Sequence, residues 1–197
     1  MTRLVLLDFW GVIGVVQSAQ AVAGMAQRMG APVSDFSKAY WQYREAHDAG
    51  GRAADFWGEV ADEVGVDLDE SAVADLIDLD VESWMGVHQD MLEFVRELHD
   101  DGRRMALLSN APRELKGHAS DVLAGLVPQL VFSCDLGVAK PEPEAFEMAL
   151  DQLGVTAPEV VFIDDNPGNV RAAQACGIAA IQHVSVESTR AALHEMG

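Results

Sequence analysis

The stretch from Leu4 to Ile13 reads LVLLDFWGVI and places a single carboxylate, Asp8, directly after four apolar residues. A short apolar run that ends in a polar residue is typical of a strand buried inside a parallel sheet. In an open parallel sheet, ligands bind in the crevice outside the carboxyl ends of the strands. The stretch therefore predicts both a buried strand and a functional carboxylate at its end.

The same stretch imitates a secretory signal, because Arg3 precedes the apolar run and Ala19-Gln20-Ala21 looks like a small-residue cleavage site. An ionised Asp8 inside such a signal would be costly. No other stretch approaches the roughly 18 consecutive apolar residues of a membrane span. We therefore expect a chain that begins at Met1, with no membrane partner.

The composition indicates an acidic, globular protein. The chain of 197 residues is long enough for one sizeable core, or for a core with a modest insertion. With 13 basic and 32 acidic residues, its formal charge of −19 repels nucleic acid and anionic membranes, which excludes both as expected partners. Cys134 and Cys176 lack metal-ligand spacing and are predicted to be reduced thiols of a cytoplasmic protein.

Short apolar runs alternate with helical patterns along most of the chain. This alternation predicts an α/β fold, in which helices cover both faces of a parallel sheet. We predict strands at residues 4–7, 105–108, 130–133, 160–163 and 179–183. We predict helices at residues 89–99, 113–123, 143–153, 168–175 and 188–194.

The region between the first strand and residue 89 does not show this alternation, because it has helical periodicity and no convincing strand. We predict a small helical bundle there, with helices at residues 19–29, 35–47, 53–64 and 70–79. The chain is therefore expected to have a sheet core of residues 1–14 and 88–197, interrupted by a helical cap of residues 15–87.

Polar side chains from four segments are expected to meet at one edge of the sheet: Asp8, Ser109, Asn110, Lys140, Asp164 and Asp165. Helix capping alone would explain any one Ser, Asn or Asp after a strand. Three carboxylates at one edge, however, stay ionised together only if a cation binds or a pKa rises. Mg²⁺ prefers oxygen ligands and is the predicted cofactor. Lys140 and Ser109 would contact an anionic ligand beside the metal.

These segments, in this order, resemble the motifs of the haloacid dehalogenase superfamily. The matching pieces are LVLLDFWGVI, MALLSNAP, LGVAKPEPEAF and VVFIDDNPGNVRAA. A response-regulator receiver domain has similar ingredients but places its acidic pair early and its lysine late. The resemblance covers nearly the whole chain and extends to the cap, where AGGRAADFWGEVADEVGV reads like the middle of the family's insertion. It implies a Rossmann-like core with a helical cap inserted after the first strand.

The resemblance also implies a role for each residue of the predicted site. Asp8 would attack the phosphorus of a small phosphorylated metabolite and form an aspartyl-phosphate. Mg²⁺ would be held by Asp8, by the backbone carbonyl of Trp10 and by the acidic pair Asp164 and Asp165. Ser109 would donate to a transferring oxygen and Lys140 would offset negative charge. The substrate would be cradled at Phe9, Trp10 and Asn110, largely by backbone N–H groups.

Trp10 departs from the family's phosphatases, which usually carry a second Asp at this position. That Asp protonates the leaving oxygen and later deprotonates the attacking water, and Trp10 can do neither. General acid–base catalysis typically contributes about 10²–10⁴ in rate, or roughly 3–5 kcal/mol. We therefore expect slow turnover or a preference for acyl phosphates and sugar 1-phosphates, unless His47, Asp48 or His88 supplies the proton.

Two other functions stay open. Haloacid dehalogenases of the superfamily carry an aromatic residue at the position of Trp10, because halide leaves without a proton. Their fourth motif, however, has an acid where this chain has Asn169, and Asp164 and Asp165 would repel a haloacid carboxylate in the absence of metal. The sequence therefore favours a phosphatase. The third possibility is a protein that binds Mg²⁺ and a phosphorylated ligand, or a protein partner, without turnover.

Overall fold

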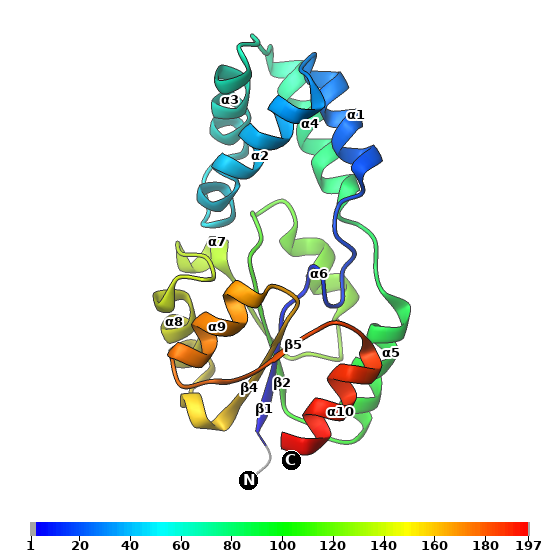
Figure 1. Cartoon of the computed structure of the whole chain (residues 1–197), viewed down its shortest axis with the longest axis vertical. Helices are drawn as coiled ribbons and strands as arrows, with labels where there is room; N and C mark the ends of the chain where they lie inside the picture. The colour runs from blue at the N-terminus through cyan, green and yellow to red at the C-terminus, as the bar shows by residue number, and fades with distance from the viewer. Residues whose placement is uncertain (1–2, 197) are drawn as a thin grey trace.

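The computed structural model describes residues 3–196, and its centre is one parallel sheet of five strands. The strand order is β3-β2-β1-β4-β5 (Figure 1). The central strand β1 pairs with β2 on one side and β4 on the other, and all four of its residues are buried. This burial on both faces explains its uninterrupted apolar sequence. The strands are β1 (Leu4–Leu7), β2 (Met105–Ser109), β3 (Gln129–Phe132), β4 (Val160–Asp164) and β5 (Ala179–Gln182).

Helices cover both faces of this sheet. Val5 and Leu7 point to one face, and Leu4 and Leu6 to the other, as the two-residue period of a strand requires. The first face packs against α5 (Gln89–Asp100), α6 (Lys116–Val122) and α10 (Val186–Met196). The second packs against α8 (Pro143–Leu153) and α9 (Pro167–Ala175). The short α7 (Ser133–Leu136) and the 3₁₀ turn η1 (Ala157–Glu159) complete this sheet lobe.

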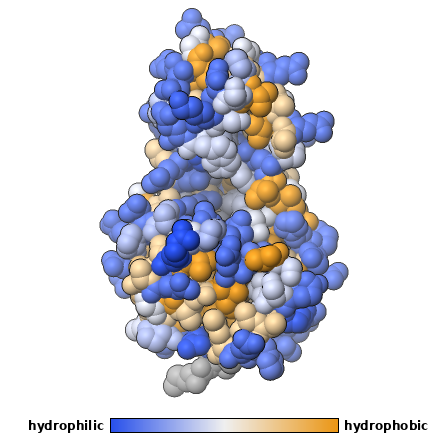
Figure 2. All heavy atoms as spheres, in the orientation of Figure 1, coloured by the Kyte–Doolittle hydropathy of each residue, from blue (hydrophilic) through white to orange (hydrophobic). Residues whose placement is uncertain are grey.

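Four further helices form a separate helical lobe beyond the carboxyl ends of the strands (Figure 1). This lobe has its own apolar core, in which Phe36, Tyr40, Phe56 and Trp57 are fully or almost fully buried. Figure 2 shows that the two lobes meet at a narrow waist. The helices are α1 (Ala19–Met29), α2 (Val33–Asp48), α3 (Ala53–Val64) and α4 (Glu70–Ser83).

The chain passes between the lobes twice, and the two connections lie side by side. The Val15 N–H donates to the Gly86 carbonyl at 2.9 Å, and the His88 N–H donates to the Ile13 carbonyl at 2.8 Å. Gly14 adds an antiparallel bridge to Val87. The paired connections therefore form one continuous link.

A second contact joins α2 to α7. The Ser133 hydroxyl donates to the Asp48 carbonyl at 2.5 Å and accepts from the Ala111 N–H at 2.9 Å. Beside it, His47 Nε2 lies 3.4 Å from Glu114 Oε2. Gly50 passes so close to α7 that an added Cβ would lie 2.8 Å from the Cys134 carbonyl oxygen. The helical lobe therefore rests directly on the sheet lobe.

The parallel α/β fold predicted from the sequence is confirmed, with small corrections at the ends of elements. The strand expected at residues 130–133 ends at Phe132, because Ser133 begins α7. The helix expected from residue 113 begins at Lys116, because the preceding residues form a turn closed by the Leu115 N–H on the Pro112 carbonyl. Within residues 3–196, no helix is long and apolar enough to cross a membrane.

Candidate active site

Asp8 is the first residue after β1, at the carboxyl end of the central strand. Its Oδ1 accepts a hydrogen bond from the Phe9 N–H at 2.7 Å and lies 2.9 Å from Lys140 Nζ. The same Nζ lies 2.7 Å from Asp164 Oδ2. Lys140 thus bridges two carboxylates that adjacent strands β1 and β4 bring together, as the position of the motifs predicts.

Asp164 and Asp165 face Asp8 at the end of β4. Each of the three residues offers a carboxylate oxygen, and these oxygens lie within 4.8 Å of one another. Asp164 is fully buried, and both of its oxygens accept hydrogen bonds from Asn169 Nδ2, at 3.2 and 3.0 Å. Asp165 is half-buried and forms no ion pair within residues 3–196. The two acids therefore differ in how freely they can bind a cation.

Burial and neighbouring charge raise the pKa of two of these acids, Asp8 and Asp165. Burial raises the pKa of Asp8 to about 8, and the charge of Asp164 adds to the rise although Lys140 opposes it. Burial and Asp164 also raise the pKa of Asp165. Burial alone would lower the pKa of Lys140, but Asp8 and Asp164 raise it instead. A bound cation would relieve the repulsion that remains.

Gly11 makes room for Asp165. Its φ is +88°, and an added Cβ would lie 2.4 Å from carboxyl atoms of Asp165. This contact sets the Trp10–Gly11 peptide bond beside the acidic pair. The three carboxylates form an all-oxygen donor set, which suits a hard divalent cation such as Mg²⁺. The residues present therefore fit the cofactor that the sequence predicts.

Ser109 and Asn110 end β2 and have different surroundings. The Ser109 hydroxyl is buried and has no hydrogen-bond partner within residues 3–196. A buried hydroxyl without a partner is unfavourable unless a ligand satisfies it. The Asn110 side chain instead holds the third motif, because its Nδ2 donates to the Lys140 carbonyl at 2.7 Å and its Oδ1 accepts from the Lys140 N–H at 2.9 Å. Both polar atoms of the Asn110 side chain therefore already have hydrogen-bond partners on Lys140.

Phe9 and Trp10 pack edge to face, with ring centroids 4.8 Å apart. Phe9 is buried in the core, and the Trp10 indole is directed to the link between the lobes, where its Nε1 donates to the Trp84 carbonyl at 3.3 Å. The contacts of Trp84 with Trp10 and of Asn169 with Asp164 were not predicted from the sequence. Asn169 stands in DDNPGN, five residues after Asp164, and its place in this motif could have suggested the contact, whereas Trp84 gives no such signal.

The three residues considered as alternative proton donors lie in two places. His47 and Asp48 end α2 at the contact with α7. His88 lies at the link and lines a polar cavity of about 560 Å³ that Asp165 and His183 also line. The structure thus brings together Asp8, Lys140, Asp164 and Asp165. Within residues 3–196, no hydrogen bond or ion pair joins His47, Asp48 or His88 to this group.

A model of the haloacid dehalogenase-like hydrolases matches residues 2–177. The chain belongs to this family. It is 29% identical over 189 residues to a phosphoglycolate phosphatase of Aliivibrio fischeri, covering 89% of this chain and 81% of that protein. It is also 29% identical over 206 residues to an (S)-2-haloacid dehalogenase of Xanthobacter autotrophicus, covering 95% and 78%.

Solved structures agree with this membership at the level of the fold. A HAD family enzyme of Bacteroides thetaiotaomicron superposes with a TM-score of 0.76 at 17% identity, covering 94% of this chain and 95% of that one. The same enzyme in complex with magnesium and inorganic phosphate gives a TM-score of 0.74. The chain is therefore a HAD-like hydrolase whose relatives include both phosphatases and dehalogenases.

Proposed function

We propose that this HAD-like hydrolase is a magnesium-dependent phosphomonoesterase that acts on a small phosphorylated metabolite through an aspartyl-phosphate on Asp8. The observation that carries the proposal is the pairing of Asp8 with Lys140 near a buried Ser109 hydroxyl that lacks a partner. The similarity to a phosphoglycolate phosphatase, and the magnesium and phosphate in the related Bacteroides enzyme, support it.

The proposed magnesium ligands are Asp8, the Trp10 carbonyl, Asp164 and Asp165. Because Asp164 already accepts hydrogen bonds from Lys140 and Asn169, we assign Asp165 the larger share of direct coordination. When bound, the ion neutralises phosphoryl oxygens and keeps Asp8 ionised.

The residues of the chain suit an in-line transfer in two halves. One oxygen of Asp8 is held by the Phe9 N–H and Lys140, which orients the other oxygen toward phosphorus. As the Asp8–phosphorus bond forms, the bond from phosphorus to the leaving oxygen breaks. Lys140 and Ser109 donate to the phosphoryl oxygens during the transfer. Water then attacks the phosphorus of the aspartyl-phosphate, which releases phosphate and restores Asp8.

The two proton transfers of the reaction have no acid or base at position 10. The Trp10 side chain cannot donate a proton to the leaving oxygen or accept one from water. Substrates whose leaving group needs little protonation are therefore favoured, such as acyl phosphates or sugar 1-phosphates.

We further propose that the helical lobe, taken as residues 15–87, serves as a cap over a core of residues 1–14 and 88–197. It stands beyond the carboxyl ends of the strands, where ligands of parallel sheets bind. The free thiols of Cys134 and Cys176 suit a reducing compartment such as the cytoplasm.

The test is hydrolysis of acetyl phosphate, p-nitrophenyl phosphate and L-2-chloropropionate, with phosphate and chloride release measured with Mg²⁺ and with EDTA. A phosphatase releases phosphate only with Mg²⁺, and the Asp8→Asn variant releases none. Chloride release that persists in EDTA would show a dehalogenase instead. Absence of any turnover would favour a ligand-binding protein.

A further inference from the structure

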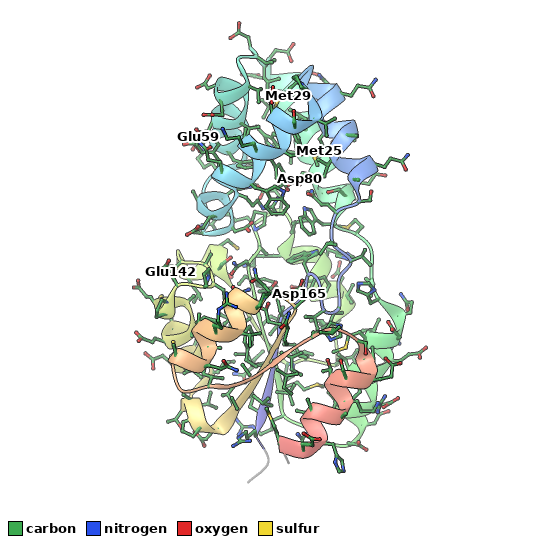
Figure 3. All side chains as sticks on the ribbon, viewed as in Figure 1. Met25, Met29, Glu59, Asp80, Glu142 and Asp165 are labelled. Carbon is green, nitrogen blue, oxygen red and sulfur yellow. The ribbon has the colours of Figure 1, made fainter. Side chains whose placement is uncertain are left out.

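A cluster of polar side chains lies inside the helical lobe at the end that faces the sheet lobe. It consists of Gln17, Tyr40, Arg44, Asp48 and Asp80, and we call it the Arg44 cluster. Gln17 belongs to the outgoing connection between the lobes, and the Asp48 carbonyl accepts from Ser133 of the sheet lobe. Figure 3 shows Asp80 near the sheet-facing end of the helical lobe and Asp165 at the facing edge of the sheet lobe.

Arg44 is bound to two carboxylates within this cluster. Its Nε lies 2.7 Å from Asp48 Oδ1, and its Nη1 lies 3.1 Å from Asp80 Oδ2. Asp80 Oδ1 also accepts from Tyr40 Oη at 2.6 Å and from Gln17 Nε2 at 2.8 Å. The Arg44 and Asp80 side chains are only 6% and 5% exposed. One guanidinium thus faces two carboxylates, and the ionised cluster has a net charge of −1.

The other cations near the junction of the lobes leave little positive charge for a ligand. Lys140 already bridges Asp8 and Asp164. Lys116 lies 2.6 Å from an oxygen of Asp135. Arg113, next to Gly50, is exposed, so water and salt screen its charge. A second negative group on a substrate, beyond its phosphate, would therefore meet an environment that is already negative.

One buried polar atom of the cluster has no hydrogen-bond partner within residues 3–196. It is Gln17 Oε1, an acceptor. The Asp48 side chain is 14% exposed, more than Arg44 or Asp80. An acceptor without a donor matches a hydroxyl group, which can donate to it, and does not match a carboxylate, which cannot.

We propose that the Arg44 cluster sets specificity by rejecting substrates with a carboxylate on the leaving group and favouring an uncharged, hydroxyl-bearing leaving group. This inference rests on the proposed phosphatase function. It distinguishes the chain from the relatives whose names specify phosphoglycolate and 2-haloacids, both of which carry a carboxylate. A site that leaves a buried charge unpaired discriminates strongly against the ligand that brings it.

The test compares 2-hydroxyethyl phosphate with phosphoglycolate, which differ mainly by a CH₂OH in place of a carboxylate. We expect kcat/KM of the natural chain to be at least about tenfold higher for 2-hydroxyethyl phosphate. Calorimetry with the Asp8→Asn variant and Mg²⁺ should give the same order of affinities without turnover. Equal values, or a preference for phosphoglycolate, would overturn the inference.

Asp80→Asn removes one negative charge and keeps a hydrogen-bonding amide, so part of the Arg44 charge becomes available to a carboxylate. We expect the preference to shrink about tenfold or more, and Asp48→Asn should act in the same direction if Asp80→Asn does not fold. Asp78→Asn is the matched control, because Asp78 is exposed on the same helix α4. An identical preference in the Asp80, Asp48 and Asp78 variants would also overturn the inference.

The two proposals fail differently. If neither p-nitrophenyl phosphate nor acetyl phosphate is hydrolysed with Mg²⁺, the phosphatase proposal fails. If they are hydrolysed and phosphoglycolate is the better of the two test substrates, the specificity inference alone fails.

Discussion

Trp10 stands where phosphatases of the superfamily usually carry the proton-transferring Asp, and its indole contributes to the link between the lobes instead. Its Nε1 donates to the Trp84 carbonyl, and the two indole rings lie 6.0 Å apart in an edge-to-face arrangement. Aromatic pairs of this kind stabilise by about 0.5–1.5 kcal/mol beyond the area they bury. At this position the chain therefore has a packing residue in place of a proton-transferring one.

The Trp10→Asp variant should show this exchange directly. We expect it to hydrolyse alkyl phosphates up to about 10²-fold faster than the natural chain, because it restores a proton donor. It should also be less stable by roughly 1–3 kcal/mol, because the packing against Trp84 is lost. The measurement is kcat/KM over a series of leaving-group pKa values, together with urea unfolding. Trp10→Phe is the control, and equal rates for the two variants on alkyl phosphates would contradict the explanation.

The raised pKa of Asp8 predicts that both the stability of the protein and its binding of Mg²⁺ depend on pH. Burial raises the folded-state pKa of Asp8 from the ordinary value of 3.8 to about 8, so between these values the folded protein holds a proton that the unfolded chain has lost. The Asp8 contribution to the stability of the metal-free protein therefore falls as pH rises through this window. Mg²⁺ must displace that proton, so its stabilising effect should grow with pH.

The check is thermal unfolding with and without millimolar Mg²⁺ at about pH 6 and about pH 8.5. We expect a larger Mg²⁺-induced rise in Tm at the higher pH. In Asp8→Asn the rise should be smaller and nearly independent of pH. A rise that is larger at low pH would show that Asp8 does not compete with protons for the metal.

Among the elements, strands and helices were largely predictable because their signals are local. The run of four apolar residues in β1 predicts a buried strand, and the spacing of the apolar residues in α5 predicts a helix with one buried face. The predicted gathering of Asp8, Lys140 and the acidic pair followed from their places at strand ends. Contacts set by tertiary packing were not predictable in this way: Arg44 and Asp48 stand at helical spacing, but nothing local joins them to Asp80.

The turn after β1 offers a test of the predicted metal site. In Gly11→Ala, the new Cβ would lie within 2.4 Å of Asp165 and the residue would keep a φ of +88°, so we expect Mg²⁺ affinity to fall at least about tenfold. Gly30→Ala is the matched control, because its φ is +80° and nothing lies within 4 Å of its added Cβ. Both variants should lose about 1–2 kcal/mol of stability from backbone strain.

Calorimetric Mg²⁺ titration separates the two glycine variants. Only Gly11→Ala should lose affinity for the ion. Equal Mg²⁺ affinities in both variants would mean that Asp165 does not need its place against Gly11 to bind the metal.

In the whole molecule, Ser133 connects the helical lobe to the loop that follows β2. Its hydroxyl joins the Asp48 carbonyl to the Ala111 N–H, one residue beyond Asn110. The position of the helical lobe is thereby coupled to the segment that holds Ser109 and Asn110. No local sequence pattern predicts this coupling, because it depends on the way α2 meets α7.

Ser133→Ala leaves the Ala111 N–H and the Asp48 carbonyl without this partner. We expect a loss of about 1–3 kcal/mol in stability and faster hydrogen exchange at the Ala111 amide. Ser34→Ala, at an exposed position of α2, should change neither. If exchange at Ala111 stays as slow as in the natural chain, the two lobes are not coupled through this hydroxyl.

The most direct test of the account is fluorine NMR of the chain with beryllofluoride, which mimics a phosphoryl group on an aspartate. With Mg²⁺, the natural chain should give fluorine resonances of a bound adduct, and these should vanish in EDTA and in Asp8→Asn. No bound resonance in the natural chain with Mg²⁺, or the same resonance in Asp8→Asn, would contradict a reactive Asp8 beside a metal ion.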